Sequence, residues 1–294
     1  MTSLRPKITT AAEERPIALP YRGRFGDPRP PDLHALALPP RPMPARDGLR
    51  PLKAWRYVGV FGAELMLCLA DVRIGPVRQS FWAVWDRPAR RLHERTRLGG
   101  GGGVVLERGR ARVKDRALAL DLRLEETAGV ETVSSSGESY AWTRKQGGIA
   151  VRGTLRFADG PPRTIDARAV IDDTAAYYER HTSWQWSAGV GHSRDGRELA
   201  WNLVAGVNDA PRESERTVWV DGQPHEAEPV AFAPDLAGVG GLRFAAEATR
   251  EHSQNLLLLR SSYRQPFGSF SGTLPGGLEL LEGYGVMEDH DVWW

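Results

Sequence analysis

Short apolar runs with a period of two occupy most of the chain from Trp55 onward. The clearest is "ALALDLRL", in which four leucines at alternate positions from Leu118 to Leu124 point to one face of an extended chain. Further runs of this kind are "WRYVGVF", "ELMLCLADVRI", "VRQSFWAVWD", "ESYAWTRK", "IAVRGTLRF", "RTIDARAVI", "RTVWVDG", "LRFAAEA" and "NLLLLRSSY". Gly, Pro or Asp-Gly separates these runs, and no helical segments alternate with them. The pattern therefore predicts antiparallel meanders joined by hairpins such as "HSRDGR".

The number of predicted strands decides the architecture. More than a dozen strands exceed what one small barrel holds, whereas two barrels of about eight strands each fit a chain of 294 residues and remove exposed sheet edges. The alternation breaks at "IDDTAAYYER", which places a domain boundary near residue 170. The predicted fold class is all-β, with two antiparallel β-barrel domains in tandem at residues 51–170 and 171–294.

The first part of the chain has a different character, because eleven of the 21 prolines lie in the first 51 residues. Proline cannot donate to a sheet ladder and breaks helices, so this segment forms neither long helices nor central strands. We expect residues 1–50 to be a proline-rich arm that wraps the body of the protein. A disordered leader is the alternative.

Composition and charge narrow the class of protein. Hydrophobic residues make up 41% and charged residues 26% of the chain, as in globular proteins. The 39 basic residues exceed the 37 acidic ones by only two, so no basic excess exists for a run of phosphates, and nucleic acid is not a predicted partner. No apolar leader and no run of about 18 apolar residues occurs, which predicts a cytoplasmic location without membrane insertion.

Cysteine usage and the missing motifs exclude several kinds of chemistry. A single cysteine, Cys68, excludes an internal disulfide framework and a cysteine-based zinc site. No G-x-S-x-G elbow, C-x-x-C pair or H-E-x-x-H helix occurs. We therefore predict no metal and no cofactor, while the oligomeric state is left open.

The aromatic stretch "YYERHTSWQWSAGVGH" is the first candidate site. Alternation puts Trp184 and Trp186 on one face, and "RELAWNLVAGVND" supplies a partner strand on which Trp201 and Asn202 face opposite ways. Depending on the strand register, either Trp201 or Asn202 would lie across from Trp186. The tryptophans can be ordinary core, or they can be a flat wall for an apolar ligand that Asn202 and His181 contact.

Two clusters supply candidate acids and bases. His181 follows an acidic segment that contains Asp172, Asp173 and Glu179. A carboxylate–imidazole pair for proton transfer is one interpretation, and a surface or structural histidine is the other. In "EGYGVMEDHDVWW" a strand would project Glu288 and His290 to the same side. These two side chains can act as an acid and a base or as two metal ligands, although no third ligand is evident. They can also serve in structural salt bridges that fix the chain end.

A third polar group lies in "SSYRQPFGSFSG", where Arg264 and Gln265 stand between aromatic residues. Such a pattern suits the mouth of a polar-lined pocket or a strand corner. We treat both residues as candidate ligand contacts.

Several stretches together resemble the domain of unknown function 2804 family. They are "KAWRYVGVFGAELMLCLADV", "FWAVWD", "YYERHTSWQWSAGVG", "DGRELAWNLVAGVND", "TVWVDG", "FGSFSG" and "GYGVMEDH", and they run from about residue 50 to the C terminus. The resemblance implies a layout similar to the lipocalin-like group, which includes carotenoid hydratases and some cyclases acting on hydrophobic substrates. The family's shared residues correspond here to His181, Trp184, Trp186, Asn202, Glu288, Asp289 and His290.

The leading functional hypothesis is a protein that binds a small hydrophobic molecule at or between two lipocalin-like barrels. It would catalyse hydration, isomerisation or cyclisation, with Glu288 or Asp173 as the acid and with Trp184 and Trp186 stabilising positive charge. The alternative is a non-catalytic carrier or scaffold with a fully packed aromatic core. A glycan-binding module is disfavoured, because tryptophan platforms for sugars need to be exposed.

Overall fold

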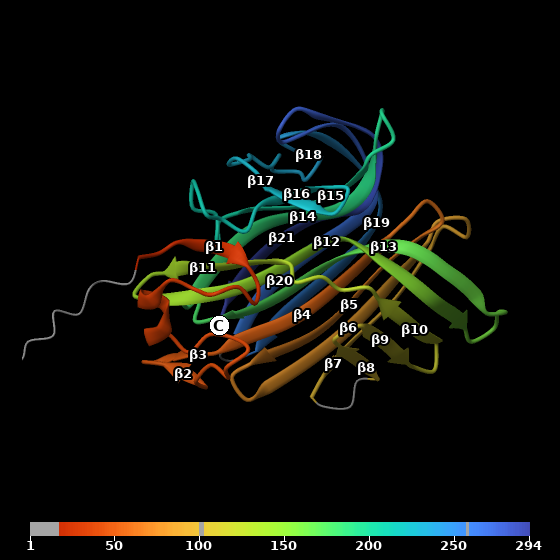
Figure 1. Cartoon of the computed structure of the whole chain (residues 1–294). Coiled ribbons are helices and arrows are strands. Elements are labelled where there is room, and N and C mark those ends of the chain that lie inside the picture. Colours follow the sequence, from red (N-terminus) through yellow and green to blue (C-terminus); the bar gives the residue numbers. More distant parts are fainter. Residues whose placement is uncertain (1–17, 100–102, 257–258) are drawn as a thin grey trace, which may run out of the picture.

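Two large antiparallel sheets make up most of the protein (Figure 1). The computed structural model describes residues 18–99, 103–256 and 259–294. The first sheet contains β1 (Tyr21–Arg24), β4 (Lys53–Phe61), β5 (Leu65–Ile74), β6 (Val77–Asp86), β7 (Arg91–Leu98), β8 (Val104–Glu107), β9 (Arg110–Lys114), β10 (Leu118–Leu124), β11 (Val130–Ser136), β12 (Ser139–Phe157) and β13 (Arg163–Ala176).

The second sheet begins directly after the first. It contains β14 (His181–Ser193), β15 (Glu198–Ala205), β16 (Thr217–Val220), β17 (Gln223–Glu226), β18 (Gly238–Val239), β19 (Gly241–Leu256), β20 (Leu259–Leu274) and β21 (Leu278–Trp293). The remaining elements are a small hairpin of β2 (Arg46–Asp47) and β3 (Arg50–Pro51), and a short 3-10 helix (Pro31–Ala35). The all-β prediction is confirmed.

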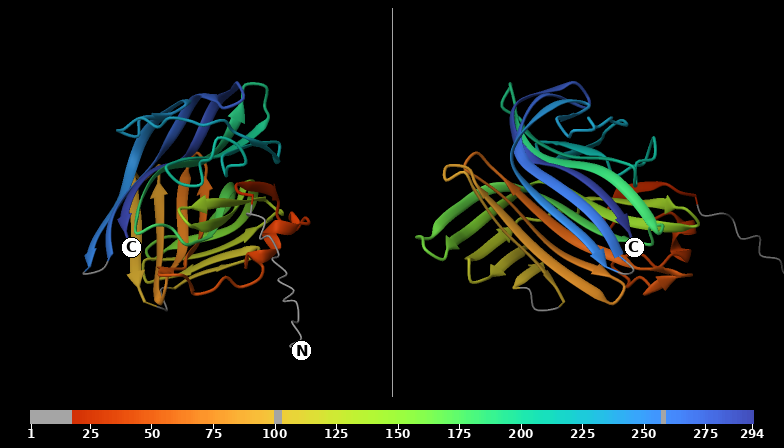
Figure 2. Two further views of the ribbon diagram at one scale, coloured as in Figure 1. Left: turned by 90° about the vertical axis from the view of Figure 1, so that its left-hand side faces the viewer. Right: turned by 180° about the vertical axis from the view of Figure 1, so that it is seen from behind.

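Each sheet is strongly curled (Figure 2). The strand order is β7-β6-β5-β4-β13-β12-β10-β9-β8 in the first sheet, where β12 also pairs with β11 and β11 with β1. The order is β17-β16-β15-β14-β21-β20-β19-β18 in the second sheet. The end strands of neither order pair with each other among the described residues. The two predicted barrels are therefore two half-barrel bodies.

The change of sheet falls between β13 and β14, at residues 177–180. The acidic residues Asp172 and Asp173 interrupt the apolar alternation near residue 170, but they do not end the strand. Asp172 is paired with Lys145 and Asp173 with Arg56, so both carboxylates are accommodated within the sheet. The pattern breaks here because a charged side chain with a buried partner can replace an apolar one.

Two other strand boundaries differ from the sequence pattern. "ESYAWTRK" and "IAVRGTLRF" form one strand, β12, because Gly147 and Gly148 make a bulge in its pairing with β13. In contrast, "NLLLLRSSY" contains the ends of two strands, since Leu256 of β19 pairs with Leu259 of β20. Glycine and turn signals alone do not separate a bulge from a chain reversal.

The apolar core has three main parts, which explains why many strands are apolar on both faces. One cluster fills the curve of the first sheet and includes Val58, Leu120 and Ile171. A second fills the curve of the second sheet, around Trp201. The third lies between the sheets and includes Tyr57 with residues of both. This third cluster holds the two half-barrels together.

The described part of the proline-rich arm packs on the first sheet. β1 pairs with β11, while Leu33 and Leu38 are buried against Val133 and Trp142. Residues 1–17 of the predicted arm lie outside the described residues. None of the described residues forms a helix long and apolar enough to cross a membrane.

Candidate functional site

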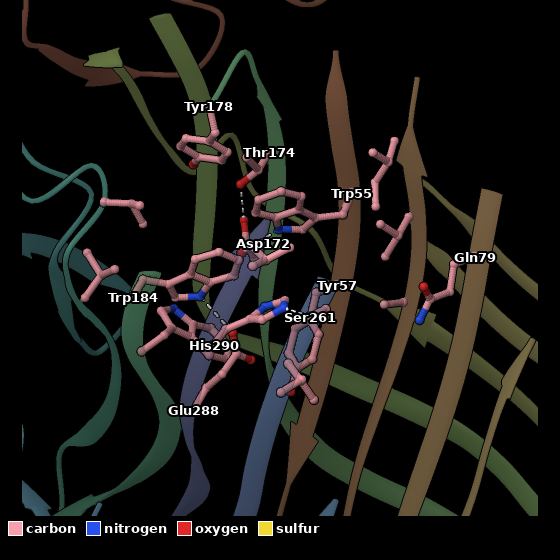
Figure 3. Close-up of a pocket in the computed structure, with 18 of the residues that line it drawn as sticks. Trp55, Tyr57, Gln79, Asp172, Thr174, Tyr178, Trp184, Ser261, Glu288 and His290 are labelled. Carbon is pink, nitrogen blue, oxygen red and sulfur yellow. Dashed lines mark hydrogen bonds between the residues drawn. The ribbon is translucent and has the colours of Figure 1, made fainter. Parts of the chain in front are cut away.

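A cavity of about 140 Å³ lies between the two sheets, beside their shared core (Figure 3). Apolar and aromatic side chains make up most of its wall, and a few polar groups converge on it. The residues that line it include Trp55, Tyr57, Phe81, Lys145, Asp172, Tyr178, Trp184, Trp186, Glu215, Arg250, Tyr263, Glu288 and His290. Such an apolar recess with few polar groups is typical of a small-molecule site.

The strand register of the second sheet builds one wall. Trp186 of β14 lies opposite Glu288 of β21. The Glu288 side chain accepts a hydrogen bond from Gln265 of β20. Gln265 in turn lies opposite Arg250 of β19. One step along the strands, Trp184 lies opposite His290. Alternation places both rows on the face toward the first sheet.

The first sheet supplies the opposite wall in the same way. Asp172 of β13 lies opposite Tyr57 of β4. Tyr57 lies opposite Ala70 of β5, and Ala70 lies opposite Phe81 of β6. Trp55 is two residues before Tyr57 and points to the same side. The cavity is therefore a product of pairing between strands that are far apart in the sequence.

Glu288 is the central polar group of the site. Its Oε1 accepts a hydrogen bond of 2.8 Å from Trp184 Nε1, and its Oε2 accepts one of 2.9 Å from Gln265 Nε2. The residue is 8% exposed. Burial raises the pKa of its carboxyl to about 7, although the hydrogen bonds from Trp184 and Gln265 act to lower that pKa. Near neutral pH this carboxyl can hold a proton and release it.

His290 lies next to Glu288 along the same face of β21. Its ring centre is 4.3 Å from that of Trp184, and its Nε2 is 2.8 Å from Ser261 Oγ. Removal from water lowers the pKa of His290 to about 3, so the imidazole is neutral at physiological pH. A neutral ring beside Glu288 can accept or donate a hydrogen bond without adding charge.

Flat aromatic surfaces face the polar groups. The Trp55 and Trp184 rings are nearly parallel, at 7°, with centres 6.4 Å apart. The indole nitrogens point to different carboxylates, because Trp55 Nε1 donates to Asp172 Oδ2 at 3.1 Å whereas Trp184 Nε1 donates to Glu288. These hydrogen bonds fix both rings at the cavity wall.

A buried charge cluster closes one side of the cavity. Lys145 Nζ lies 2.5 Å from Asp172 Oδ1 and 3.3 Å from Glu215 Oε1. Asn208 donates to Glu215 Oε2 at 3.1 Å and to the Tyr178 hydroxyl at 2.7 Å. Burial raises the pKa of Glu215, although Lys145 opposes that rise. Because Lys145 belongs to β12 and Glu215 to the loop before β16, this cluster joins the two sheets.

The structure brings together several residues that the sequence pattern singled out. Trp184, Trp186, Glu288 and His290 all line the cavity. Gln265 is buried behind Glu288 and bonded to it. Asn202 is also buried, and its Oδ1 accepts a hydrogen bond of 2.8 Å from Trp186 Nε1.

The register that brings Asn202 to Trp186 is neither of the two we expected. Val204 lies opposite Trp186, and Asn202 pairs with Ala188. Asn202 therefore reaches the Trp186 indole diagonally, which the length of both side chains allows. Trp201 points to the other face and packs in the core of the second sheet.

Three other candidates lie away from the cavity. Asp173 points to the opposite face of β13 from Asp172 and binds Arg56 at 2.7 Å. His181 is exposed, with its Nε2 at 2.8 Å from Asp291, and it stacks on Trp293. Arg264 is exposed and lies 3.5 Å from Glu251. None of the three side chains is among the residues that line the cavity.

Sequence reasoning missed the residues that the first sheet contributes, and it also missed Arg250 of the second sheet. Trp55, Tyr57, Asp172 and Arg250 line the cavity, yet each stands in an ordinary strand pattern. The one available signal was Asp172, a charged residue inside an apolar strand. The acidic pair "DD" drew attention to this place, but without the register it could not show which aspartate faces the cavity.

The fold and this site define a lipocalin-like protein of two half-barrels with an apolar cavity between them. The family model described as "Domain of unknown function (DUF2804)" matches residues 105–294. The chain therefore belongs to this family, as its sequence resemblance indicated. A comparison with curated proteins finds no match.

A comparison with solved structures finds several similar chains. Kievitone hydratase from Nectria haematococca superposes with a TM-score of 0.54 at 12% identity, covering 81% of this chain and 88% of that chain. An AttH-type protein of Nitrosomonas europaea has a TM-score of 0.48 at 14% identity, covering 86% and 98%. CghA has a TM-score of 0.40 at 12% identity, covering 93% and 97%. The likeness to the hydratase shows a common fold, and the lipocalin-like layout is confirmed.

Proposed function

We propose that this protein binds a small, largely apolar molecule in the cavity between its sheets and protonates it through Glu288. The reaction would be the hydration, isomerisation or cyclisation of a substrate with a carbon–carbon double bond. One observation carries this proposal: a carboxyl with a pKa of about 7 at the wall of an aromatic cavity. General acids are effective when their pKa lies near the working pH.

The proton balance of the proposed reaction is simple. The Glu288 carboxyl gives its proton to one carbon of the double bond, whose π electrons form the new C–H bond and leave a cation at the other carbon. In hydration, water adds to that cation and a proton returns to the Glu288 carboxylate. In isomerisation, a neighbouring C–H proton returns instead. In cyclisation, a second double bond attacks the cation before the proton is lost. Each route restores the acid.

The surroundings of Glu288 suit both stages of such a reaction. Trp184 Nε1 and Gln265 Nε2 donate to the carboxylate left after proton transfer. The faces of Trp55 and Trp184 can stabilise a cation by about 1 to 2 kcal/mol when water is excluded. A cavity of about 140 Å³ has room for a group the size of an aromatic ring.

A carrier or scaffold is the second candidate, and one observation favours it. Both oxygens of Glu288 already accept hydrogen bonds from within the chain. In this case Glu288 would orient Trp184 and Gln265 and would transfer no proton. The two functions differ in what replacement of Glu288 does to turnover and to binding.

The first test identifies the ligand. Native mass spectrometry of the purified protein, followed by organic extraction, should reveal a bound hydrophobic molecule, either as isolated or after exposure to an extract of lipids and isoprenoids. Loss of that molecule in Trp184→Ala, with an unchanged circular dichroism spectrum, would place it at the cavity. A chain that stays empty under both conditions would contradict binding.

The second test separates an enzyme from a carrier. With the extracted molecule in D₂O, an acid-catalysed reaction incorporates solvent deuterium into the product, which mass spectrometry detects. We expect Glu288→Gln to lower the turnover number by about 10²- to 10⁴-fold while the ligand is still bound. Asp289→Asn, on the neighbouring exposed position of β21, should leave turnover unchanged. Equal deuterium incorporation in Glu288→Gln would support a role for Glu288 in structure alone.

A further inference from the structure

Arg250 is a buried cation at the cavity wall that the proposed proton transfer does not use. The side chain projects from β19 and is 2% exposed. Its guanidinium carbon lies 3.9 Å from the ring centre of Phe81 in the first sheet and 4.9 Å from that of Tyr263 in the second. Two aromatic faces therefore hold the guanidinium in place between the sheets.

The hydrogen-bonding capacity of this guanidinium is mostly unused. Among the described residues, only one hydrogen bond satisfies it, from Nη2 to Thr96 Oγ1 at 2.8 Å. Its Nε is buried and has no hydrogen-bond partner there. A guanidinium has five N–H donors, and a buried donor without a partner costs free energy. The arrangement leaves room for an acceptor that the chain itself does not supply.

The nearest carboxylate does not meet this need. Glu94 Oε2 lies 3.4 Å from Arg250 Nε, in a position that makes no hydrogen bond, and the Glu94 side chain is 39% exposed. Burial also raises the pKa of Glu94, although the positive charge of Arg250 acts to lower it. Glu94 is therefore a loose partner that a better placed anion can replace.

A second donor in the cavity is also unpartnered. The hydroxyl of Tyr57 is buried beside the thiol of Cys68, and it forms no hydrogen bond to a nitrogen or oxygen atom of the described residues. Burial raises its pKa well above the usual value, so this group stays a donor at physiological pH. Two unpartnered donors in one cavity favour a ligand that carries oxygen acceptors.

We propose that Arg250 binds a carboxylate group of the ligand, so that the substrate class is a flat, apolar carboxylate. This inference rests on the proposed binding in the cavity. The planar fork of a guanidinium matches the two oxygens of a carboxylate. Arg250 is opposite Gln265, and Gln265 binds Glu288, so a ligand held by its carboxylate extends its apolar body toward the acid and the indoles.

Two matched pairs of compounds test this assignment: trans-cinnamate with cinnamamide, and 2-naphthoate with 2-naphthamide. Each pair differs in the acidic group alone. Trp55, Trp184 and Trp186 line the cavity, so tryptophan fluorescence and calorimetry can report binding. We expect the wild type to bind the carboxylates about 10- to 100-fold more tightly than the amides, as charge-assisted hydrogen bonds allow.

Variants assign that preference to one residue. Arg250→Gln should bring the two affinities of each pair within a factor of about two, and Arg250→Lys should keep part of the preference because it keeps the charge. Arg243→Gln, an exposed arginine on the same strand, is the control and should keep the full preference. Melting curves verify folding, and the wild-type ratio tests the proposal even if Arg250→Gln does not fold.

The outcomes separate this inference from the proposed function. Equal affinities within each pair in the wild type, or a preference that survives in a folded Arg250→Gln, would overturn the role of Arg250 and leave the cavity site intact. Binding of no member of either pair would overturn the carboxylate assignment, while the native mass spectrum decides separately whether the cavity holds an apolar ligand. A Glu288→Gln variant that retains the preference would show that carboxylate binding and proton transfer are separate functions of the site.

Discussion

At the scale of single residues, Glu288 shows how a fold changes the chemistry of a side chain. An exposed glutamate is ionised at neutral pH, but burial raises the pKa of this one to about 7. His290, one step along the same face, is changed in the opposite sense, with a pKa of about 3. Both shifts have one cause, because removal from water disfavours the charged form of either group.

The raised pKa of Glu288 predicts a pH dependence of stability. The folded state binds the proton more tightly than the unfolded state, so this group favours folding at low pH. That contribution is lost as the pH rises from about 4.5 to about 7. A shift of this size corresponds to roughly 3 kcal/mol in the free energy of unfolding.

Denaturant unfolding of the wild type and of Glu288→Gln between pH 4.5 and 8 measures this effect. We expect the wild type to lose stability relative to the variant as the pH rises, since the amide does not ionise. His290 is present in both proteins, and its contribution to stability increases only between pH values of about 3 and 6.5. This contribution therefore cancels in the comparison. A constant difference across the range would mean that Glu288 titrates as in water.

Alternation along "MEDHD" correctly predicted that Glu288 and His290 share a face. It could not predict their pKa values, because these depend on Tyr263 and Trp184, which come from other strands. The same limit applies to the acidic pair. Asp172 and Asp173 are chemically alike, and only the pairing of β13 with its neighbours shows that Asp172 faces the cavity.

At the scale of elements, the glycine bulge in β12 brings the two sheets together. Gly147 lies against the ring of Trp219, which belongs to β16 of the second sheet. A Cβ added at Gly147 would lie 2.2 Å from Trp219 Cε3, far inside van der Waals contact. The glycine pair that resembles a strand break in the sequence is therefore a place where a side chain of the other sheet packs directly on the backbone.

Gly147→Ala should lower the free energy of unfolding by about 1 to 3 kcal/mol, because the methyl group overpacks a filled interface. Trp219→Phe should cost less in the Gly147→Ala background than in the wild type, since the smaller ring makes space. Gly160→Ala is the control, because its added Cβ would have its nearest neighbour at 3.9 Å. Additive effects of Gly147→Ala and Trp219→Phe would contradict the contact.

At the scale of the whole molecule, polar contacts join the sheets on two sides of the cavity. Lys145 of the first sheet binds Glu215 in the loop before β16 of the second, and Arg250 of the second sheet donates to Thr96 of the first. The apolar cluster around Tyr57 and Trp186 lies between these contacts. We infer that the cavity exists only while the two half-barrels are docked.

Lys145→Met tests the larger of these polar contacts. Removal of the cation leaves Asp172 and Glu215 buried without a counter-ion, and we expect a loss of about 3 to 5 kcal/mol in the free energy of unfolding. The exposed Lys114→Met is the control and should change stability by less than about 0.5 kcal/mol. The loss should shrink when Glu215→Gln is combined with Lys145→Met. Equal small effects at both lysines would show that the cluster is solvated.

The sequence by itself determined the all-β class, the two bodies, and the face on which Trp184, Trp186, Glu288 and His290 lie. These features follow from the two-residue repeat of a strand, which is a local property of the chain. The tertiary structure decided which strands pair, and hence that Asp172 and Arg250 line the cavity whereas Trp201, Asp173 and Arg264 do not. Register and sheet docking depend on contacts between residues far apart in the sequence, so no local pattern contains them.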